Sequence, residues 1–321
     1  MTPSSAKTAA TALGAVAAVG AAAFAYGSLI ERNRFTIRHE IAPVLDPGAR
    51  PLTVLHLSDL HMAPWQERKQ EWVRSLALLE PDLIINTGDN LGHVDGIEGI
   101  ERALQIFAGI PGVFVHGSND YFGPSFKNPF TYFGGPSAKP AKPATLDTAR
   151  LEHYFEDTLG WLSLNNTSRA IEIKGSRLEF FGTNDAHRNW DRLDRLPGAI
   201  EEMRENVGWQ DSPGPEPVAI GVTHAPYRRV LDSFVTYGAE IIFAGHTHGG
   251  QVRIPGLPAL VTNCDIPREQ AQGLSVWHHA RRAAFLEVSA GIGTSIYAPV
   301  RFACRPEAVL VTLTPGDIGY S

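Results

Sequence analysis

The sequence contains little cysteine. Its 321 residues include two, Cys264 and Cys304, which is too few for a disulfide framework. The two do not form the C-x-x-C pair of a structural zinc site. The sequence does not give the distance between them, so one disulfide in an exported domain and two buried thiols both remain open.

Clustered positive charge is also missing. The formal net charge is -6, and no run of five Lys or Arg residues occurs in the chain. A nucleic-acid backbone is bound by a basic field, so we expect no nucleic-acid partner. The segment Gly291–Ser295 reads GIGTS and lacks the lysine of a phosphate-cradling Walker loop, so an NTP-driven motor is not supported.

Apolar residues are abundant, at 43% of the chain, and this share is typical of a globular protein. Residues Ala9–Ile30 carry no charge and are enough to cross a bilayer as a helix. We favour a membrane anchor, because no polar face interrupts the run. A cleaved signal peptide is the alternative, since Ala23-Phe24-Ala25 matches the A-x-A cleavage pattern. A buried helix of a soluble domain is the third interpretation.

Charges flank this segment on both sides. Lys7 precedes it, while three arginines and two glutamates follow between residues 31 and 40. The positive-inside rule slightly favours a cytoplasmic main domain and leaves the side of the membrane undecided. We divide the chain into residues 1–30, the anchor or signal segment, residues 31–50, a linker with a first strand, and residues 51–315, the main domain.

In the main domain, short β-branched and apolar runs alternate with helical patterns, which predicts an α/β fold. The predicted strands are Leu52–Leu57, Leu83–Asn86, Val113–His116, Leu178–Phe181, Val218–Val222, Ile241–Phe243, Phe285–Val288 and Ala308–Leu313. The predicted helices are Gln66–Leu79, Ile97–Phe107 and Tyr227–Tyr237. Residues Gly123–Thr145 show no period, so we expect a surface loop there, with a flap over the functional site as the alternative.

Polar residues follow six of these strands in turn. The clusters, in chain order, read SDLH, TGDN, GSND, GTNDAH, THAP and AGHTHGG. Ligands bind outside the carboxyl ends of the strands in open α/β sheets, so we expect the clusters to share one edge. Carboxylates and imidazoles gathered there would stay poorly solvated unless a cation neutralised them.

The residue types in these clusters indicate two metal ions. Asp59 and His61 lie two residues apart and project to one side of an extended segment, and His246 and His248 repeat that spacing. The predicted metal ligands are Asp59, His61, Asp89, Asn119, His224, His246 and His248. Seven ligands are more than one ion needs, and oxygen and nitrogen donors without thiolate suit Mn, Fe or Zn. A pair of such ions can activate water against a phosphate ester.

The order of the clusters resembles the calcineurin-like metallophosphoesterase superfamily over Leu52 to Leu313. The ending GHTHGGQ behind an apolar leader resembles its membrane-anchored bacterial branch. The resemblance implies a two-sheet sandwich flanked by helices, to which the N-terminal apolar helix is added. It also implies two metal sites. Asp59, His61, Asp89 and His248 would hold the first ion; Asp89 as the bridge, Asn119, His224 and His246 would hold the second.

One cluster departs from the family pattern. The family reads Gly-Asn-His-Asp where this chain reads Gly117-Ser118-Asn119-Asp120. Asn119 or Ser118 would supply the ligand, and we favour Asn119 because an amide oxygen is the better neutral donor. In the family the His, held by the Asp, helps protonate the leaving group. His187 or His116 could replace it, or a good leaving group could make an acid unnecessary.

We therefore predict a metal-dependent hydrolase of phosphate monoesters, phosphate diesters or a pyrophosphate link. Its catalytic candidates are Asp89, Asn119, Asp120 and His187, and Arg301 is the candidate for substrate phosphate, with a structural ion pair as its alternative role. The expected substrate is a phosphorylated small molecule or a lipid-linked compound at the membrane. The altered third cluster keeps open a metal-binding scaffold without catalysis, and a nuclease is disfavoured by the acidic balance.

Overall fold

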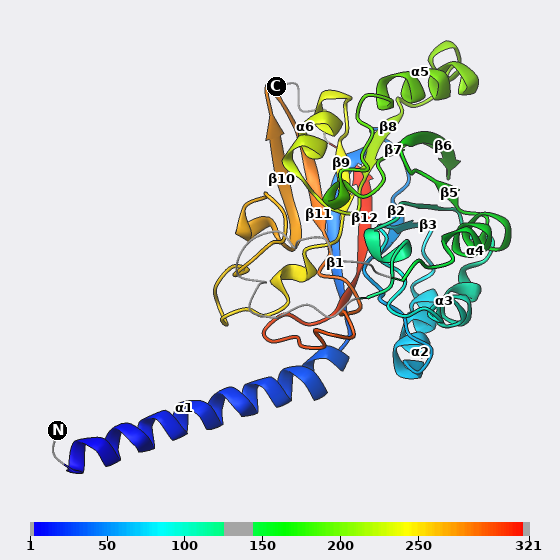
Figure 1. Ribbon diagram of the computed structural model, residues 1–321. Coiled ribbons are helices and arrows are strands. Elements are labelled where there is room, and N and C mark those ends of the chain that lie inside the picture. The colour runs from blue at the N-terminus through cyan, green and yellow to red at the C-terminus, as the bar shows by residue number, and fades with distance from the viewer. Residues whose placement is uncertain (1–2, 125–143, 317–321) are drawn as a thin grey trace.

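Two six-stranded sheets packed face to face form the body of the protein (Figure 1). The computed structural model describes residues 3–124 and 144–316. The first sheet has the strand order β1-β12-β2-β3-β4-β5, and the second has the order β10-β11-β9-β8-β7-β6. This architecture confirms the predicted α/β sandwich with its added N-terminal helix.

The strands differ in length between the two sheets. The strands of the first sheet are β1 (Thr36–Leu45), β2 (Leu52–Leu57), β3 (Leu83–Asn86), β4 (Gly112–Phe114), β5 (Leu162–Ser163) and β12 (Glu307–Pro315). Those of the second are β6 (Thr167–Ile173), β7 (Ser176–Gly182), β8 (Val218–Val222), β9 (Ile241–Ala244), β10 (Gly273–His279) and β11 (Arg282–Val288).

Helices cover the outer faces of both sheets (Figure 1). The helices over the first sheet are α2 (Glu67–Ser75), α3 (Ile97–Leu104) and α4 (Thr148–His153), and those over the second are α5 (Leu196–Val207) and α6 (Arg228–Thr236). Central strands therefore have apolar residues on both faces, as strands covered on both sides require.

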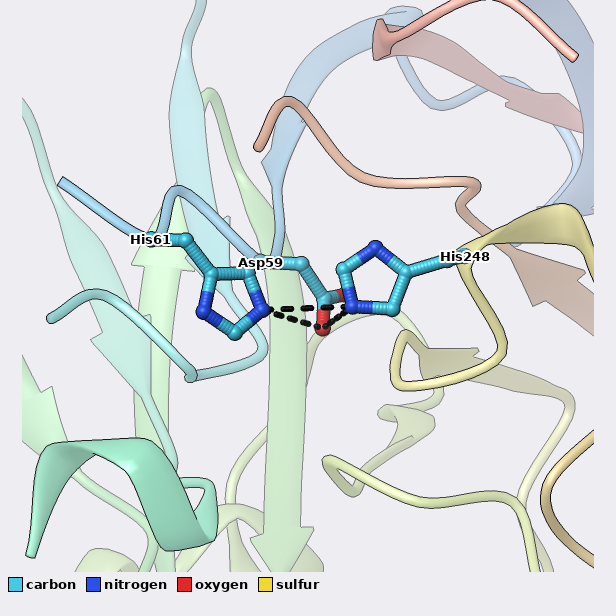
Figure 2. A group of neighbouring side chains, drawn as sticks. All are labelled: Asp59, His61 and His248. Carbon is cyan, nitrogen blue, oxygen red and sulfur yellow. Dashed lines mark hydrogen bonds and ion pairs between the residues drawn. The ribbon is translucent and has the colours of Figure 1, made fainter. Parts of the chain in front are cut away.

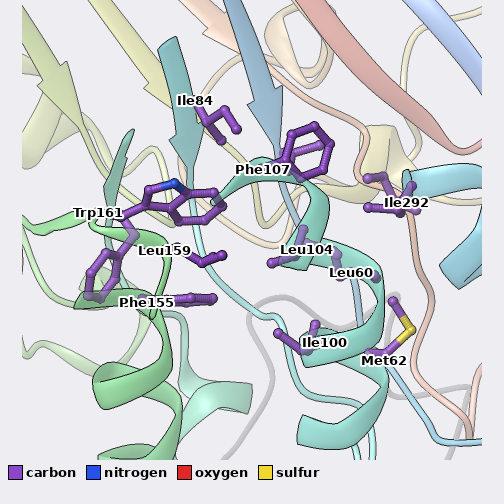
Figure 3. Close-up of a cluster of buried hydrophobic side chains, with 14 of the residues drawn as sticks. Leu60, Met62, Ile84, Ile100, Leu104, Phe107, Phe155, Leu159, Trp161 and Ile292 are labelled. Carbon is purple, nitrogen blue, oxygen red and sulfur yellow. The ribbon is translucent and has the colours of Figure 1, made fainter. Parts of the chain in front are cut away.

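Three buried clusters hold these layers together. The middle one lies between the sheets and includes Val54 and Val311 from the first sheet with Phe180 and Phe243 from the second. The outer cluster of the first sheet is shown in Figure 3, where Ile100 and Leu104 of α3 project toward the strands. Their four-residue spacing places both on one helical face. Burial of these side chains fixes the sheets and therefore the loops at the strand ends.

The central strands of each sheet run parallel, and their carboxyl ends are aligned. Leu57 at the end of β2 pairs with Asn86 at the end of β3, and Gly182 of β7 pairs with Val222 of β8. The six polar clusters follow β2, β3, β4, β7, β8 and β9. Three of these strands belong to each sheet, so the clusters meet where the two sheets adjoin.

The N-terminal helix α1 (Pro3–Leu29) projects from the domain (Figure 1). Within the part of the chain that the structure describes, Thr11–Asn33 is the one segment long and apolar enough to cross a membrane, with a mean hydropathy of 1.8. A signal sequence near an N-terminus also meets this criterion of length and composition. Only 6% of its apolar window is buried, so the interpretation of a buried core helix is wrong.

The end of α1 is joined to the segment that precedes β12. Arg301 N donates to Gly27 O at 3.2 Å, and the Glu31 carboxylate accepts from Cys304 N at 2.9 Å. The rings of Tyr26 and Phe302 meet edge to face, 6.2 Å apart. These contacts join the apolar helix α1 directly to the domain.

Several elements differ from the sequence-based prediction. The structure adds β5, β6, β10, α4 and α5. The predicted strand Val113–His116 ends at Phe114, because His116 turns away into the loop. Most of Gly123–Thr145, the predicted loop or flap, lies outside the described residues. Cys264 and Cys304 are free thiols, which rules against the disulfide alternative.

Candidate metal centre

The loops after β2 and β9 bring Asp59, His61 and His248 together. Figure 2 shows the two imidazoles on either side of the Asp59 carboxylate. The Nε2 atoms of the two histidines lie 3.2 Å apart. Asp59 Oδ1 lies 3.4 Å from His248 Nε2 and 3.9 Å from His61 Nε2. Three potential ligand atoms therefore face one point, as a metal site requires.

A second group adjoins the first through Asp89. Its Oδ2 lies 3.4 Å from His224 Nε2 and 3.7 Å from His61 Nε2. His246 Nδ1 lies 3.2 Å from His224 Nε2. Asn119 donates to both oxygens of Asp89, from its backbone N at 2.8 Å and from Nδ2 at 2.5 Å. The fold thus brings all seven predicted ligands together, and it places Asp89 between the two groups.

One buried oxygen shows that a cation fits this arrangement. Asp59 is fully buried, and within the described chain its Oδ1 has no hydrogen-bond partner. Its other oxygen accepts from Ser58 Oγ at 2.6 Å and from His246 N at 3.0 Å. A buried carboxylate oxygen without a donor is costly. A divalent ion facing Oδ1 would satisfy it, and the two imidazoles beside it are neutral donors of the right kind.

Burial keeps three of these imidazoles neutral, which is the form that binds a metal ion. Burial lowers the pKa of His61 to about 4, and burial followed by the charge of Arg301 lowers the pKa of His248 to about 3. Burial also holds the pKa of His246 well below its usual value. All three are neutral at physiological pH, so each offers a lone pair to a metal without first losing a proton.

Asp89 and His224 shift each other's pKa in opposite directions. Burial alone would raise the pKa of Asp89, but the charge and hydrogen bond of His224 hold it well below the usual value. Burial would lower the pKa of His224, but Asp89 raises it well above the usual value. His224 Nδ1 lies 2.8 Å from the carbonyl oxygen of Thr87. A hydrogen bond to that carbonyl directs Nε2 toward Asp89 and orients the ring.

The backbone at the site adopts conformations that side-chain-bearing residues seldom take. Asp59, His61, Asp89, His246 and His248 all have positive φ, between 40° and 67°. Such residues cost of order 1–3 kcal/mol each and occur mostly at functional sites. Five of the seven predicted ligands are therefore held in strained positions by the structure around them.

Glycines make room for this packing. A Cβ atom on Gly117 would collide with Asp89 Oδ1 and lie 2.8 Å from the His224 ring, and one on Gly245 would collide with Ser58 Oγ and lie 2.6 Å from Asp59 Oδ2. At both positions the backbone passes so close to a predicted ligand that a side chain would displace it.

Asp120 holds the loop that carries Asp89. Its carboxylate accepts from Asp89 N at 2.9 Å, Asn90 N at 2.7 Å and Gly117 N at 3.0 Å. It is fully buried, behind the ligands. Its contacts are those of a positioning residue for the TGDN loop.

The two candidate acids have different surroundings. His116 lies between two carboxylates, with Nε2 3.2 Å from Glu152 Oε1 and Nδ1 3.5 Å from Asp120 Oδ2. Burial would lower its pKa, but hydrogen bonds to Asp120 and Glu152 raise it to about 9. His187 lies beside the site, its ring 4.6 Å from that of His246 and its Nδ1 3.0 Å from Tyr227 Oη. Of the two, His187 is the one whose ring contacts that of a predicted ligand.

Arg301 is buried against His248, which differs from its predicted role. Its side chain is fully buried, and Nη2 donates to the carbonyls of Ala290 at 2.7 Å and Gly293 at 2.6 Å. The same nitrogen lies 3.3 Å from His248 Nδ1. The guanidinium therefore contacts His248 and carbonyl oxygens from a buried position, which disagrees with the predicted contact to a substrate phosphate. Among the residues that the structure describes it forms no ion pair either, the alternative role that the sequence suggested.

Other supporting residues escaped the sequence-based interpretation. Lys69 Nζ donates to the carbonyls of Leu60 at 2.5 Å and His61 at 3.1 Å. Asn263 Nδ2 lies 3.2 Å from His246 Nε2. Asp185 is fully buried beside the cluster, and burial raises its pKa to about 6. Only Asp185 had a sequence signal, the D-x-H spacing to His187.

A sandwich of two sheets with buried Asp and His residues at its parallel strand ends defines a protein of the metallophosphoesterase class. Residues 52–250 match the family model for calcineurin-like phosphoesterases. The chain belongs to that family, whose members are generally metal-dependent hydrolases.

Two relatives come from Bacillus subtilis. The chain is 28% identical to the uncharacterized protein YpbG over 272 residues, which cover 83% of this chain and 82% of the relative. It is 23% identical to the uncharacterized metallophosphoesterase YkuE over 312 residues, which cover 95% and 93%.

Among solved structures, the NAD nucleotidase of Haemophilus influenzae aligns with a TM-score of 0.41 and 8% identity, over 76% of this chain and 51% of that chain. This chain thus spans about half the length of that protein. A dimetal phosphatase from Danio rerio aligns with a TM-score of 0.35 and 10% identity, over 82% and 98%.

Proposed function

We propose that the protein is a dinuclear metal-dependent hydrolase of phosphate esters in the membrane-anchored bacterial branch of the family. The observation that carries the proposal is a pair of ligand groups, Asp59-His61-His248 and Asp59-Asp89-His224, that share Asp59. Within the described chain, Oδ1 of this buried carboxylate has no hydrogen-bond partner. Mn, Fe or Zn suit these oxygen and nitrogen donors.

The residues divide into two ligand sets. Asp59, His61 and His248 form the first set with Asp89, and Asn119, His224 and His246 complete the second. When bound, such ions lower the pKa of water and neutralise the charge of a phosphate. Asn119 donates to both oxygens of Asp89, and its amide oxygen is the proposed neutral donor to the second set. His187, beside His246, is the proposed proton donor to the leaving group.

A lipid-linked substrate is favoured by what surrounds the site. The loop that follows His248 exposes the aliphatic side chains of Val252, Ile254 and Leu257. Val252 pairs with Phe302, whose ring meets Tyr26 near the end of α1. Aliphatic side chains exposed together favour contact with a membrane or an apolar ligand. A phosphate headgroup at the membrane surface would then lie close to the metal centre.

Purified full-length protein in detergent, loaded with Mn, tests the proposal on aryl phosphate mono- and diesters. We expect turnover, and we expect Asp89→Asn to reduce kcat/KM by 100-fold or more, because both ligand sets lose the shared carboxylate. The matched control is Asp194→Asn, which removes an exposed carboxylate paired with Arg192. It should keep the wild-type rate.

Measurement of the bound metal distinguishes the ways in which the proposed function could be wrong. Bound metal with no turnover on any ester would favour a scaffold, the alternative that the altered Gly117–Asp120 cluster suggests. Full activity in Asp89→Asn would remove the bridging role.

A comparison of His187→Ala with His116→Ala on esters with good and poor leaving groups tests the acid. A selective loss on poor leaving groups should appear in His187→Ala. Equal rates of the two variants on both kinds of ester would remove that role from His187.

A further inference from the structure

A pocket of about 520 Å³ lies where α1 ends, and none of the seven predicted ligands lines it. Three segments form it: the short helix η1 (Glu31–Asn33), the start of α2, and residues 292–299. Basic side chains of Arg32, Arg68 and Lys69 line it. The pocket is therefore open to a ligand and has a charged wall at the level where α1 would leave a membrane.

The most buried of these cations has only neutral partners. Lys69 is 6% exposed, and the partners of its Nζ are the carbonyl oxygens of Leu60 and His61. Among the described residues, neither Lys69 nor Arg32 forms an ion pair, and Arg32 Nε is buried without a hydrogen-bond partner. Buried cations are normally paired. An anion bound in this pocket would pair with both side chains.

The nearby acids do not supply it. The Glu31 carboxylate is occupied by Cys304 N. Glu67 lines the pocket but is exposed to solvent, where water screens its charge. The buried part of the pocket therefore keeps an excess of positive charge.

The start of α2 strengthens the same field. No side chain caps the first turn of this nine-residue helix, and the pocket is lined by its first residues. Uncapped N–H groups and the helix dipole favour an anion there, above all a phosphate. The start of α2 and the buried Lys69 line the same pocket.

The rest of the pocket suits a lipid. Its walls include the apolar side chains of Phe35, Ile296 and Pro299, and the exposed indole of Trp65. Aromatic residues of this kind concentrate at the membrane interface. A second pocket of about 410 Å³ shares Phe35 and Arg68 with the first and adds Arg34, Arg305 and one acid, the exposed Glu71. Three arginines against one glutamate extend the basic surface around the end of α1.

We propose that this pocket binds the phosphate group of an anionic phospholipid, taken from the membrane that α1 spans. Lys69, Arg32 and the start of α2 hold the phosphate, and the apolar wall accepts the beginning of the acyl chains. The proposal rests on the proposed membrane anchor and does not require that the protein hydrolyse anything.

Binding to full-length protein in nonionic detergent tests it, with chelator present so that the metal centre cannot hold phosphate. The probes are dihexanoyl phosphatidylglycerol, dihexanoyl phosphatidylcholine and inorganic phosphate, followed by calorimetry. We expect phosphatidylglycerol to bind at least about tenfold more tightly than either of the others. Arg32→Gln and Lys69→Gln should each weaken it about tenfold.

The control variant is Arg281→Gln, an exposed arginine in the turn between β10 and β11. That turn lies at the end of the sheet away from α1 (Figure 1), so its binding should match wild type. Arg32→Gln lies outside the metal-binding loops and tests the site even if Lys69→Gln fails to fold. Equal binding of the two lipids, or binding unchanged in Arg32→Gln, would overturn the proposal. Inorganic phosphate that binds as tightly as phosphatidylglycerol would overturn the membrane source.

Discussion

Single residues at the candidate metal centre combine a strained backbone conformation with a buried polar side chain. Asp59 has a φ of 49° and a fully buried carboxylate, and burial raises its pKa. Neither condition would persist unless the surrounding packing imposed it. An added methyl group at such a site should therefore lower the free energy of unfolding more than the same change made elsewhere.

Gly245→Ala tests that expectation. The new methyl group would collide with Ser58 Oγ and crowd Asp59 Oδ2, so we expect a loss of about 1–3 kcal/mol in unfolding free energy and a lower metal content. Gly198→Ala in α5 is the matched control, because nothing lies within 4 Å of its added Cβ. It should stabilise the protein by about 0.5–1 kcal/mol. Urea unfolding and metal analysis measure both, and unchanged metal content in Gly245→Ala would contradict the packing argument.

Arg301→Met separates a positioning role from a substrate role. The change leaves the carbonyls of Ala290 and Gly293 without their donor, which should cost on the order of 3 kcal/mol. Loss of the contact to His248 should weaken metal binding by about 10- to 100-fold. The control Arg281→Met removes an exposed guanidinium. A raised KM with unchanged stability and metal affinity would restore Arg301 to the substrate.

His116 should make stability depend on pH. Its folded pKa of about 9 lies above the unfolded value of 6.5. Its contribution is therefore complete below about pH 6.5 and is lost as the pH rises through 9, by on the order of 3 kcal/mol in total. His116→Gln should flatten the dependence of unfolding free energy on pH in this window. His153→Gln, which changes an exposed histidine, should keep it, and a slope that survives in His116→Gln would assign it elsewhere.

The convergence of the seven predicted ligands could be predicted because they share a rare composition and follow strands. D-x-H and G-H-T-H spacing in the sequence is enough to single out Asp59, His61, His246 and His248. The role of Arg301 could not be predicted, since the sequence does not show that it is fully buried against carbonyl oxygens. Lys69 gave no signal either, because a lysine at the start of an amphipathic helix is usually solvated.

At the scale of elements, periodicity identified the buried strands and the amphipathic helices. It missed α5, whose Pro197-Gly198 pair is typical of a turn although proline is well tolerated in a first helical turn. It missed the β6–β7 hairpin, where Lys174 and Gly175 both have positive φ as in a type I′ turn. In both cases a local signal for a turn concealed the element beside it.

For the molecule as a whole, the decisive feature is that α1 ends against the segment that supports the metal centre. Arg301 N donates to Gly27 O, and Cys304, whose N donates to Glu31, also has Sγ 3.3 Å from His248 O. Helix end, supporting segment and His248 therefore form one continuous set of contacts. Cleavage after Ala25, the position that a signal peptide would use, would leave Gly27 in a free terminus and loosen this set.

We therefore predict that α1 is retained. The protein isolated from membranes should have an intact mass that includes Ala9–Ile30, and it should resist extraction by alkaline carbonate, because a spanning helix is not released by loss of ionic contacts. Ala25→Leu removes the small residue that signal cleavage requires and serves as the control. Its mass should equal that of wild type if no cleavage occurs. A wild-type mass that begins at Tyr26, together with a longer Ala25→Leu product, would show that α1 is a signal sequence and would leave the domain without its anchor.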